Sequence, residues 1–448
     1  MNSASQAAQL EPGQMGSIFW PRRILGPRPG LKEVNLICWA LFVTFLLVPL
    51  CVVHWIQVKH GEGTIRHYQP DFVVFYGFGE MAREYPATRI YDYDLEKQTF
   101  TAIYPEQHNG LFYGPALYPP FVAVFFSLLA HFSFETAYFL WLGISLALYL
   151  AGIGAAAISV FPGERLKVSL VFCFAIAFFP FLFSAWLNGQ LSTVAAFAVG
   201  LAIYLEKRGS MFYSGLALAL LAYKPTLLVF LVPMLLLTRR FRSFAGFITG
   251  AASLFLAGTA FGGLGVWPAY LHLLEYYGRF TEAGGRSILQ LKMYVDFSSV
   301  SHMIPGGRTA VGLTIMIASA IVAAISLALL LWRSREYERP AQWLAWAATL
   351  TWTLLLNVYV PIYDSVLVII AVVLTLGALR DLGWSAATEW TTFLGVVIFA
   401  VSWETEPFAK AHGIQLLTIA LVVLGVAELL YLQRAIQQCH GKSLPASR

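Results

Sequence analysis

The segment Val34–Ile56 has the sequence VNLICWALFVTFLLVPLCVVHWI and contains no Asp, Glu, Lys or Arg. A transmembrane helix needs about 20 mostly apolar residues, because every backbone amide must find its hydrogen bond inside the hydrocarbon. Val34–Ile56 therefore predicts a membrane-spanning helix. Similar apolar stretches recur along the chain up to residue 433. We predict an all-α polytopic membrane protein.

The composition excludes a soluble class of protein. Hydrophobic residues make up 58% of the chain, charged residues only 12%, and the mean hydropathy is +0.68, whereas about a quarter of the residues in soluble domains are charged. The net charge of +5 requires no nucleic-acid partner, since Lys and Arg concentrate in short loops where they set membrane orientation. No metal or disulfide spacing is seen among the four cysteines, which we expect to pack in the core: Cys38, Cys51, Cys173 and Cys439.

The charge distribution predicts the domain organisation. Residues 1–33 are polar and basic and should be a cytoplasmic N-terminus without a cleavable signal. Residues 34–433 form one membrane domain, with extracytoplasmic loops at 57–116 and 263–308, and residues 434–448 form a cytoplasmic tail. Alternating loop charges favour about twelve transmembrane helices. The topology of residues 117–160 stays open, since one of its two apolar segments is expected to be re-entrant or shallow.

Asp71 is the main candidate for chemistry. It stands at the start of the aromatic run Phe72–Tyr76, in the long polar loop that follows the first predicted span. A short helix here would lie along the membrane interface with its apolar side down, and the carboxylate would sit at its N-terminus. The alternative is a helix cap, because Asp before an apolar run caps well.

Aromatic residues crowd the same loop, and Tyr118 closes it just before Pro119-Pro120, which should open the next helix. Tyrosine rings interspersed with carboxylates are suited to binding a sugar, although an interfacial aromatic belt has the same composition. Tyr363 and Asp364 form a second outer cluster at the start of an apolar helix. Asp364 is either a cap or a ligand for an acceptor or sugar hydroxyl.

Two polar positions interrupt apolar hairpins. Lys224-Pro225 lies between two apolar arms, where a lysine is costly unless it pairs with an anion, lines a polar cavity or snorkels to the interface. Phosphate binding is therefore one interpretation of Lys224. Gln190 follows Asn188-Gly189 at another hairpin tip, either as a simple turn or as a hydrogen-bond donor to a substrate.

The second outer segment carries further candidates. Arg286 and Lys292 are candidate partners of a lipid phosphate, and His302 is a candidate ligand for a sugar or acceptor. Solvated loop charge is the alternative for each of them.

From Asp71 to Asp364 the chain resembles glycosyltransferase family 87, the polyprenyl-phosphate-dependent mannosyltransferases of the GT-C fold. The resemblance rests on the order of several pieces over about residues 65–375. They are Asp71 with its aromatic run, Tyr118-Pro119-Pro120, Gly189-Gln190, the stretch Gly215–Pro225 (GLALALLAYKP), Leu235-Leu236-Leu237 before Arg239–Arg242 (RRFR), and Tyr363-Asp364.

The resemblance implies a GT-C membrane enzyme that takes a hexose, with mannose the expected sugar, from a polyprenyl-phosphate carrier at the outer face of a bacterial plasma membrane. Asp71 would act as base toward the acceptor hydroxyl, with inversion. The candidate ligands of the donor phosphate are Lys224 and Gln190, which stand in the matching pieces, and Arg286 and Lys292, which are proposed from their charge alone. Tyr118, Tyr363, Asp364 and His302 would contact acceptor or sugar. No cofactor and no metal are expected, because the lipid-linked sugar is a substrate.

The expected partners are the lipid donor, membrane lipids and an acceptor that is a glycolipid, a polysaccharide or a protein. A secondary transporter remains an alternative, although no repeat is visible and most ionisable residues lie in loops. A lipid-carrier-dependent polysaccharide polymerase or ligase is another, although its large loop would be expected late in the chain.

Overall fold

The computed structural model describes residues 71–103, 115–282, 291–303, 307, 309–336, 339–358 and 360–442, without the side chains of 278–282 and 439–442. The predicted first span, the cytoplasmic N-terminus and Arg286 lie outside these residues. Within them every regular element is a helix, and one isolated antiparallel bridge joins Tyr294 to Pro361. The all-α prediction is confirmed for this part of the chain.

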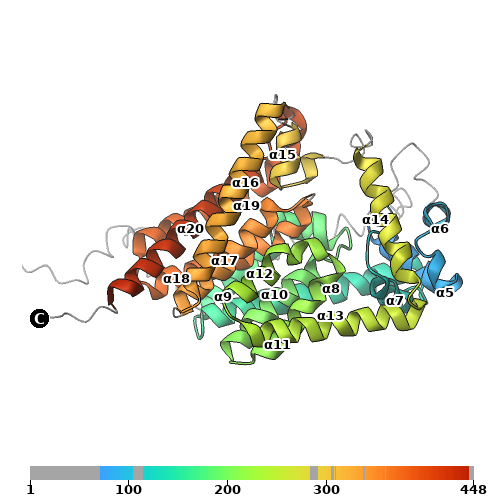
Figure 1. The fold of residues 1–448 in the computed structure, drawn as a ribbon, viewed down its shortest axis with the longest axis horizontal. Helices are drawn as coiled ribbons and strands as arrows, with labels where there is room; N and C mark the ends of the chain where they lie inside the picture. The colour runs from blue at the N-terminus through green and yellow to red at the C-terminus, as the bar shows by residue number, and fades with distance from the viewer. Residues whose placement is uncertain are drawn as a thin grey trace, which may run out of the picture.

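The elements follow one another as helices of very different length (Figure 1). The first part contains α5 (Phe72–Glu84), η3 (Ala87–Arg89), α6 (Tyr93–Ile103), α7 (Pro120–Leu129), α8 (Phe134–Val160), α9 (Arg165–Ile176), η5 (Pro180–Trp186), α10 (Ser192–Lys207), α11 (Met211–Leu218), η6 (Ala219–Tyr223), η7 (Pro225–Leu227) and α12 (Leu228–Leu237). The second contains α13 (Phe241–Gly262), α14 (Val266–Glu282), η9 (Leu291–Met293), α15 (Phe297–Met303), α16 (Ala310–Ser334), α17 (Arg339–Leu356), η10 (Ile362–Val366), α18 (Leu367–Asp381), α19 (Ser385–His412) and α20 (Leu416–Lys442).

Six helices in the described residues are long and apolar enough to cross a membrane, or seven if α9 and η5, which are bent by 51°, form one broken span. The six are α8, α13, α16, η10 with α18, α19 and α20. Three predicted segments instead form shorter apolar helices: Pro120–Leu129, Met211–Tyr223 and Pro225–Leu237. Within 117–160, α8 is therefore the long span, and α7 is the short segment. The total of about twelve spans stays a prediction.

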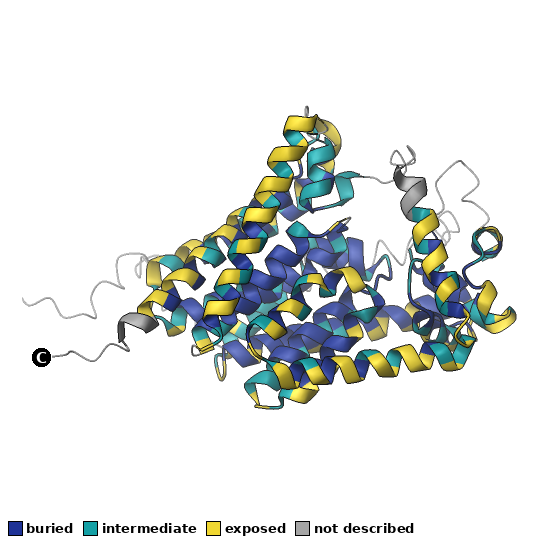
Figure 2. Cartoon of the chain, in the orientation of Figure 1, coloured by how far each residue is buried: buried dark blue, intermediate teal, exposed yellow. Residues whose placement is uncertain are grey.

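Close helix contacts build the centre of the bundle. An added Cβ on Gly200 of α10 would lie 2.0 Å from the carbonyl oxygen of Gly152 of α8, so both backbones can approach this closely only without side chains. Figure 2 shows buried residues concentrated in these central helices and exposed ones along α13 and α16. The exposed side chains of α16 are largely apolar, as at Val311 and Val322, which is expected of a helix that faces lipid.

Helix α5 begins directly after Asp71, as predicted, and its apolar side packs against protein, while its position at the membrane interface stays a prediction. Its buried residues run round the helix instead of along one stripe. The ring of Phe72 is within 6.2 Å of those of Phe126, Phe134 and Tyr138 (centroid distances). Aromatic side chains from α7 and α8 therefore cover the face that was expected to rest on lipid.

Candidate functional site

The carboxylate of Asp71 is held by the hairpin tip that follows η5. The side-chain amide of Gln190 donates a hydrogen bond of 2.6 Å to Asp71 Oδ2, and the backbone amide of Phe72 donates one of 2.9 Å to the carbonyl of Asn188. Asp71 makes no side-chain capping hydrogen bond to α5. Of the two interpretations of Asp71, a side-chain helix cap is thus wrong, and its carboxylate is directed toward Gln190.

The hairpin tip is shaped by a π-helical turn and a glycine. Just after η5, the backbone amide of Gln190 bonds to the carbonyl of Ala185, a residue of η5 five positions earlier, at 2.8 Å. Gly189 adopts a φ of 72°, and an added Cβ would lie 2.7 Å from Cβ of Phe72. Trp141 of α8 donates to the carbonyl of Gly189 at 2.7 Å. Only glycine meets both demands at position 189, the left-handed backbone and the contact with α5.

A second carboxylate, that of Asp364, is held by Ser192, which lies two residues after Gln190 at the start of α10. The hydroxyl of Ser192 donates to Asp364 Oδ1 at 2.8 Å, and the ammonium of Lys224 forms a hydrogen-bonded ion pair with Oδ2. The side chain of Asp364 is 1% exposed and that of Lys224 19%. Lys224 Nζ also lies 5.0 Å from the ring centroid of Tyr363. Because an ammonium carries three donors, Asp364 leaves Lys224 able to bind a further acceptor.

The local backbone explains why these charges meet. The predicted break at Lys224-Pro225 is present, with 3-10 turns on both sides of Lys224. Asp364 lies inside η10, whose N-cap is Pro361, so the predicted cap role of Asp364 is wrong. Its carboxylate is instead the ion-pair partner of Lys224. Of the alternatives for Lys224, pairing with an anion is the one that the structure bears out.

Tyrosine side chains connect the two carboxylates. The phenol of Tyr118 interacts electrostatically with both Asp364 and Asp71, and with Tyr294, while burial raises its pKa. Tyr223 and Tyr363 also interact with Asp364. Because Gln190 and Ser192 are two residues apart, Asp71 and the Asp364–Lys224 pair belong to one site, and nearby phenol groups can donate hydrogen bonds to sugar hydroxyls. Pro120 opens α7 beside this site, as predicted.

Asp296 joins the second outer segment to the site. This fully buried carboxylate accepts hydrogen bonds of 2.8 Å from the amide and hydroxyl of Ser299 and from the amide of Val360. Burial raises the pKa of Asp296, and these hydrogen bonds lower it by less. The hydrogen bond between Asp296 and Val360 holds the two segments together beside the Tyr294–Pro361 bridge. Tyr294 is thereby placed next to η10, which contains Asp364.

The other predicted ligands are placed differently. Lys292 Nζ lies 3.8 Å from a carboxylate oxygen of Glu406 on α19, and within the described residues Asp71 and Asp364 form no ion pair with it. His302 Nδ1 lies 2.5 Å from the carbonyl oxygen of Ser298, one turn earlier in α15. Arg286 is outside the described residues. The structure thus gathers Asp71, Gln190, Lys224, Tyr118, Tyr363 and Asp364, but not Lys292.

Sequence reasoning missed Ser192, Tyr223, Tyr294 and Asp296. Tyr223 directly precedes Lys224, and Ser192 lies two residues after Gln190, so both are adjacent to residues that were predicted. Nothing in the sequence near Asp296 indicates its partner Val360, because that contact joins two segments far apart in the chain.

The electrostatics of Asp71 favour proton transfer. Its burial raises its pKa, and the Gln190 hydrogen bond lowers it by less. A carboxylate with a raised pKa is a stronger base than one in water. The described residues contain no group of three or more His, Cys, Asp or Glu placed to hold a metal ion. The start of α10 thus holds a candidate base, Asp71, and the ion pair that contains the cation Lys224.

A model of one protein family, described as glycosyltransferase family 87, matches residues 116–361. The matched range contains Gln190, Ser192 and Lys224, while Asp71 and Asp364 lie outside its two ends. Neither a curated protein nor a solved structure matches the chain.

Proposed function

Because the chain belongs to glycosyltransferase family 87, we propose that it transfers mannose from a polyprenyl-phosphate carrier to an acceptor hydroxyl, with inversion. The protein is a membrane glycosyltransferase with several apolar helices. The observation that carries the proposal is the start of α10, where Gln190 holds Asp71 and Ser192 holds the Asp364–Lys224 pair.

Asp71 is the base in this mechanism. Gln190 binds Oδ2, and Oδ1 accepts the proton of the acceptor hydroxyl. The acceptor oxygen then forms its bond to the anomeric carbon as the bond from that carbon to the phosphate oxygen breaks. The electron pair departs with the polyprenyl phosphate, so a β-linked donor gives an α-mannoside. General-base assistance of this kind contributes about 10²–10⁴-fold in rate.

Lys224 neutralises the leaving phosphate. Charge stabilisation at a departing phosphate is the main electrostatic demand of this reaction, and the ammonium of Lys224 keeps donors beyond the one that Asp364 occupies. We assign Asp364 the task of orienting Lys224, in addition to the predicted contact with a sugar hydroxyl.

The described part of the site holds two carboxylates, Asp71 and Asp364, against one cation, Lys224. A phosphate therefore needs further positive charge when it binds. Arg286 and Lys292 are our proposed sources, and Lys292 would have to exchange Glu406 for the phosphate. Tyr118, Tyr363 and His302 are the proposed ligands of the sugar or acceptor.

The site is proposed to face the extracytoplasmic side of a bacterial plasma membrane. This assignment rests on loop charge, since basic residues such as Lys207, Arg208 and Arg240 lie at the helix ends away from the Asn188–Gln190 turn. The acceptor is a glycolipid, a polysaccharide or a protein. No cofactor is required by this scheme.

The test uses membranes that contain the full-length protein, radiolabelled polyprenyl-phosphate mannose and candidate glycolipid acceptors. Wild type should form product, and Asp71→Asn should lose transfer by about 10³-fold at unchanged expression. Asp92→Asn is the matched control, since Asp92 is an exposed carboxylate paired with Arg89, and it should keep full activity. Equal turnover by Asp71→Asn and wild type would remove Asp71 from the mechanism. Uptake of a soluble solute by proteoliposomes without any donor would instead favour a transporter.

A further inference from the structure

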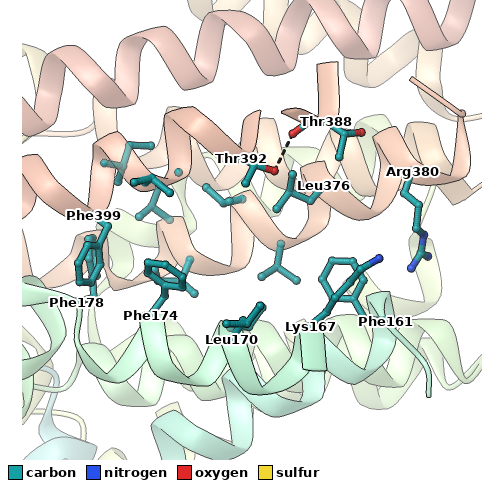
Figure 3. Close-up of a pocket in the computed structure, with 18 residues that line it drawn as sticks. Phe161, Lys167, Leu170, Phe174, Phe178, Leu376, Arg380, Thr388, Thr392 and Phe399 are labelled. Atoms are coloured by element: carbon teal, nitrogen blue, oxygen red, sulfur yellow. Dashed lines mark hydrogen bonds between the residues drawn. The ribbon is translucent and has the colours of Figure 1, made fainter. Parts of the chain in front are cut away.

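An apolar groove of about 350 Å³ lies between α9, α18 and α19, away from the site (Figure 3). Leu170 and Phe174 of α9 form one wall, and Leu376 of α18 and Val396 of α19 contribute to the other. Phe178 and Phe399 lie at one end and Phe161, Lys167 and Arg380 at the opposite end, as Figure 3 shows. The groove is therefore apolar along its length and basic at one end.

The walls of this groove belong to segments that are long and apolar enough to span the membrane: α18, α19 and the bent pair of α9 with η5. Phe174 is 42% exposed and Val396 47% exposed, so the groove opens to the surface of the bundle. In a bilayer that surface contacts hydrocarbon. The occupant that lies directly against the opening is the acyl chain of a lipid.

The length of the groove matches one leaflet. Val368 and Arg380 both line the groove, and α18 advances about 18 Å between them at the helical rise of about 1.5 Å per residue. Half of a hydrocarbon core of about 30 Å is about 15 Å. A lipid whose head group is at the basic end can therefore place one chain along the whole groove.

The basic end has an excess of positive charge. Lys167 and Arg380 both pair with Glu164, at 2.5 and 2.6 Å, and both lie over the ring of Phe161. Lys207 interacts electrostatically with Arg380 and with further neighbours. Lys207 donates to the carbonyl of Ser159, next to the Val160 carbonyl that Arg380 binds, so three cations, Lys167, Lys207 and Arg380, adjoin two carboxylates, Glu164 and Asp381. The remaining charge is complementary to an anionic head group.

We infer that the groove binds one anionic phospholipid, with an acyl chain between α9, α18 and α19 and its phosphate beside Lys167 and Arg380. The head group belongs to the leaflet on the side away from the Asn188–Gln190 turn. This inference is independent of the proposed mannosyl transfer. A sugar donor bound in the candidate site would have its phosphate near Lys224, at the other end of α18, which starts beside Asp364.

The test measures lipid bound to the purified full-length protein by native mass spectrometry, after exchange into detergent with equal amounts of phosphatidylglycerol and phosphatidylcholine. Gly395→Leu should fill the groove, because a Cβ at Gly395 meets only Val372, at 3.4 Å. Gly143→Leu is the matched control, since Gly143 lies on α8 with no atom within 4 Å of an added Cβ. We expect wild type and Gly143→Leu to retain one phosphatidylglycerol that Gly395→Leu lacks.

The head-group part of the inference is tested with Lys167→Gln. This variant should lower the preference for phosphatidylglycerol over phosphatidylcholine about fivefold, the effect of one cation at an anionic lipid. Arg242→Gln, an exposed cation in the first turn of α13, should leave the preference unchanged. Thr392→Phe provides a second filling variant, because Thr392 also lines the groove.

Several results would overturn the inference. They are equal lipid retention by Gly395→Leu, Thr392→Phe and wild type, equal binding of both lipids by wild type, and displacement of the phospholipid by a polyprenyl phosphate. A change in oligomeric state on size-exclusion chromatography, confined to the two filling variants, would make the groove a protein–protein interface instead.

Discussion

The ion pair of Lys224 with Asp364 allows the structural and catalytic roles of a buried charge to be separated. Asp364 is 1% exposed and Lys224 19%, so Lys224→Gln leaves a buried carboxylate without its cation. Breaking a buried pair in this way costs about 3–5 kcal/mol of stability. If Lys224 also stabilises the leaving phosphate, the same substitution lowers transfer about 10²–10³-fold. A single variant cannot distinguish the two effects.

The double variant Lys224→Gln with Asp364→Asn distinguishes them. The asparagine side chain introduced by the second substitution would keep an oxygen for the Ser192 hydroxyl and could donate its amide to the new glutamine, so no buried charge remains. We expect stability to return to within about 1 kcal/mol of wild type, because replacing a whole buried pair is often neutral. Transfer should stay low, since the cation is still missing.

The assay compares rates of heat inactivation in detergent with transfer from polyprenyl-phosphate mannose in membranes. The control is the exposed pair Arg89–Asp92, whose side chains are 54% and 38% exposed. Its double neutralisation should change stability by less than about 1 kcal/mol and leave transfer intact. Recovery of activity together with stability in the Lys224–Asp364 double variant would refute the catalytic role of Lys224.

Three further predictions concern the surroundings of this pair. Gln190→Leu removes the hydrogen bond that lowers the pKa of Asp71, so this pKa rises further and the acid limb of the pH–rate profile moves to higher pH; an unmoved limb would argue against Asp71 as the base. Gly189→Ala should destabilise the protein by about 1–3 kcal/mol in thermal unfolding, because the left-handed backbone is strained for alanine and its Cβ meets Phe72; unchanged stability would contradict the turn geometry. Asp296→Ala should cost about 2–4 kcal/mol by leaving buried donors unpaired, while Asp296→Asn, which keeps an acceptor, should lose less; equal losses would show that the hydrogen bonds are not responsible.

Local sequence signals predicted the helices and their breaks well. Pro120 at the start of α7 and the interruption at Lys224-Pro225 follow from the missing amide and fixed φ of proline. The helix after Asp71 follows from the apolar run that succeeds it. These features depend on a few neighbouring residues, so a single sequence is sufficient to find them.

The partners of the charged residues were not accessible in the same way. Asp364 meets Lys224 across 140 positions and Ser192 across 172, and a single sequence gives no signal for contacts so distant. The residues that cover α5 could not be predicted for a related reason. An apolar face predicts burial, but it does not distinguish lipid from the aromatic side chains of α7 and α8 that cover Phe72.

The π-helical turn η5 (Pro180–Trp186) sets the register of the candidate site through one additional residue. A π turn accommodates one residue more than an α turn over the same rise, and Gln190 and Ser192 lie within six residues of its end. If this turn relaxed to α geometry at unchanged chain length, the residues after it would move about 100° round the helix axis. Gln190 and Ser192 would then both point away from Asp71 and Asp364. The additional residue in η5 therefore aligns these two side chains with the two carboxylates.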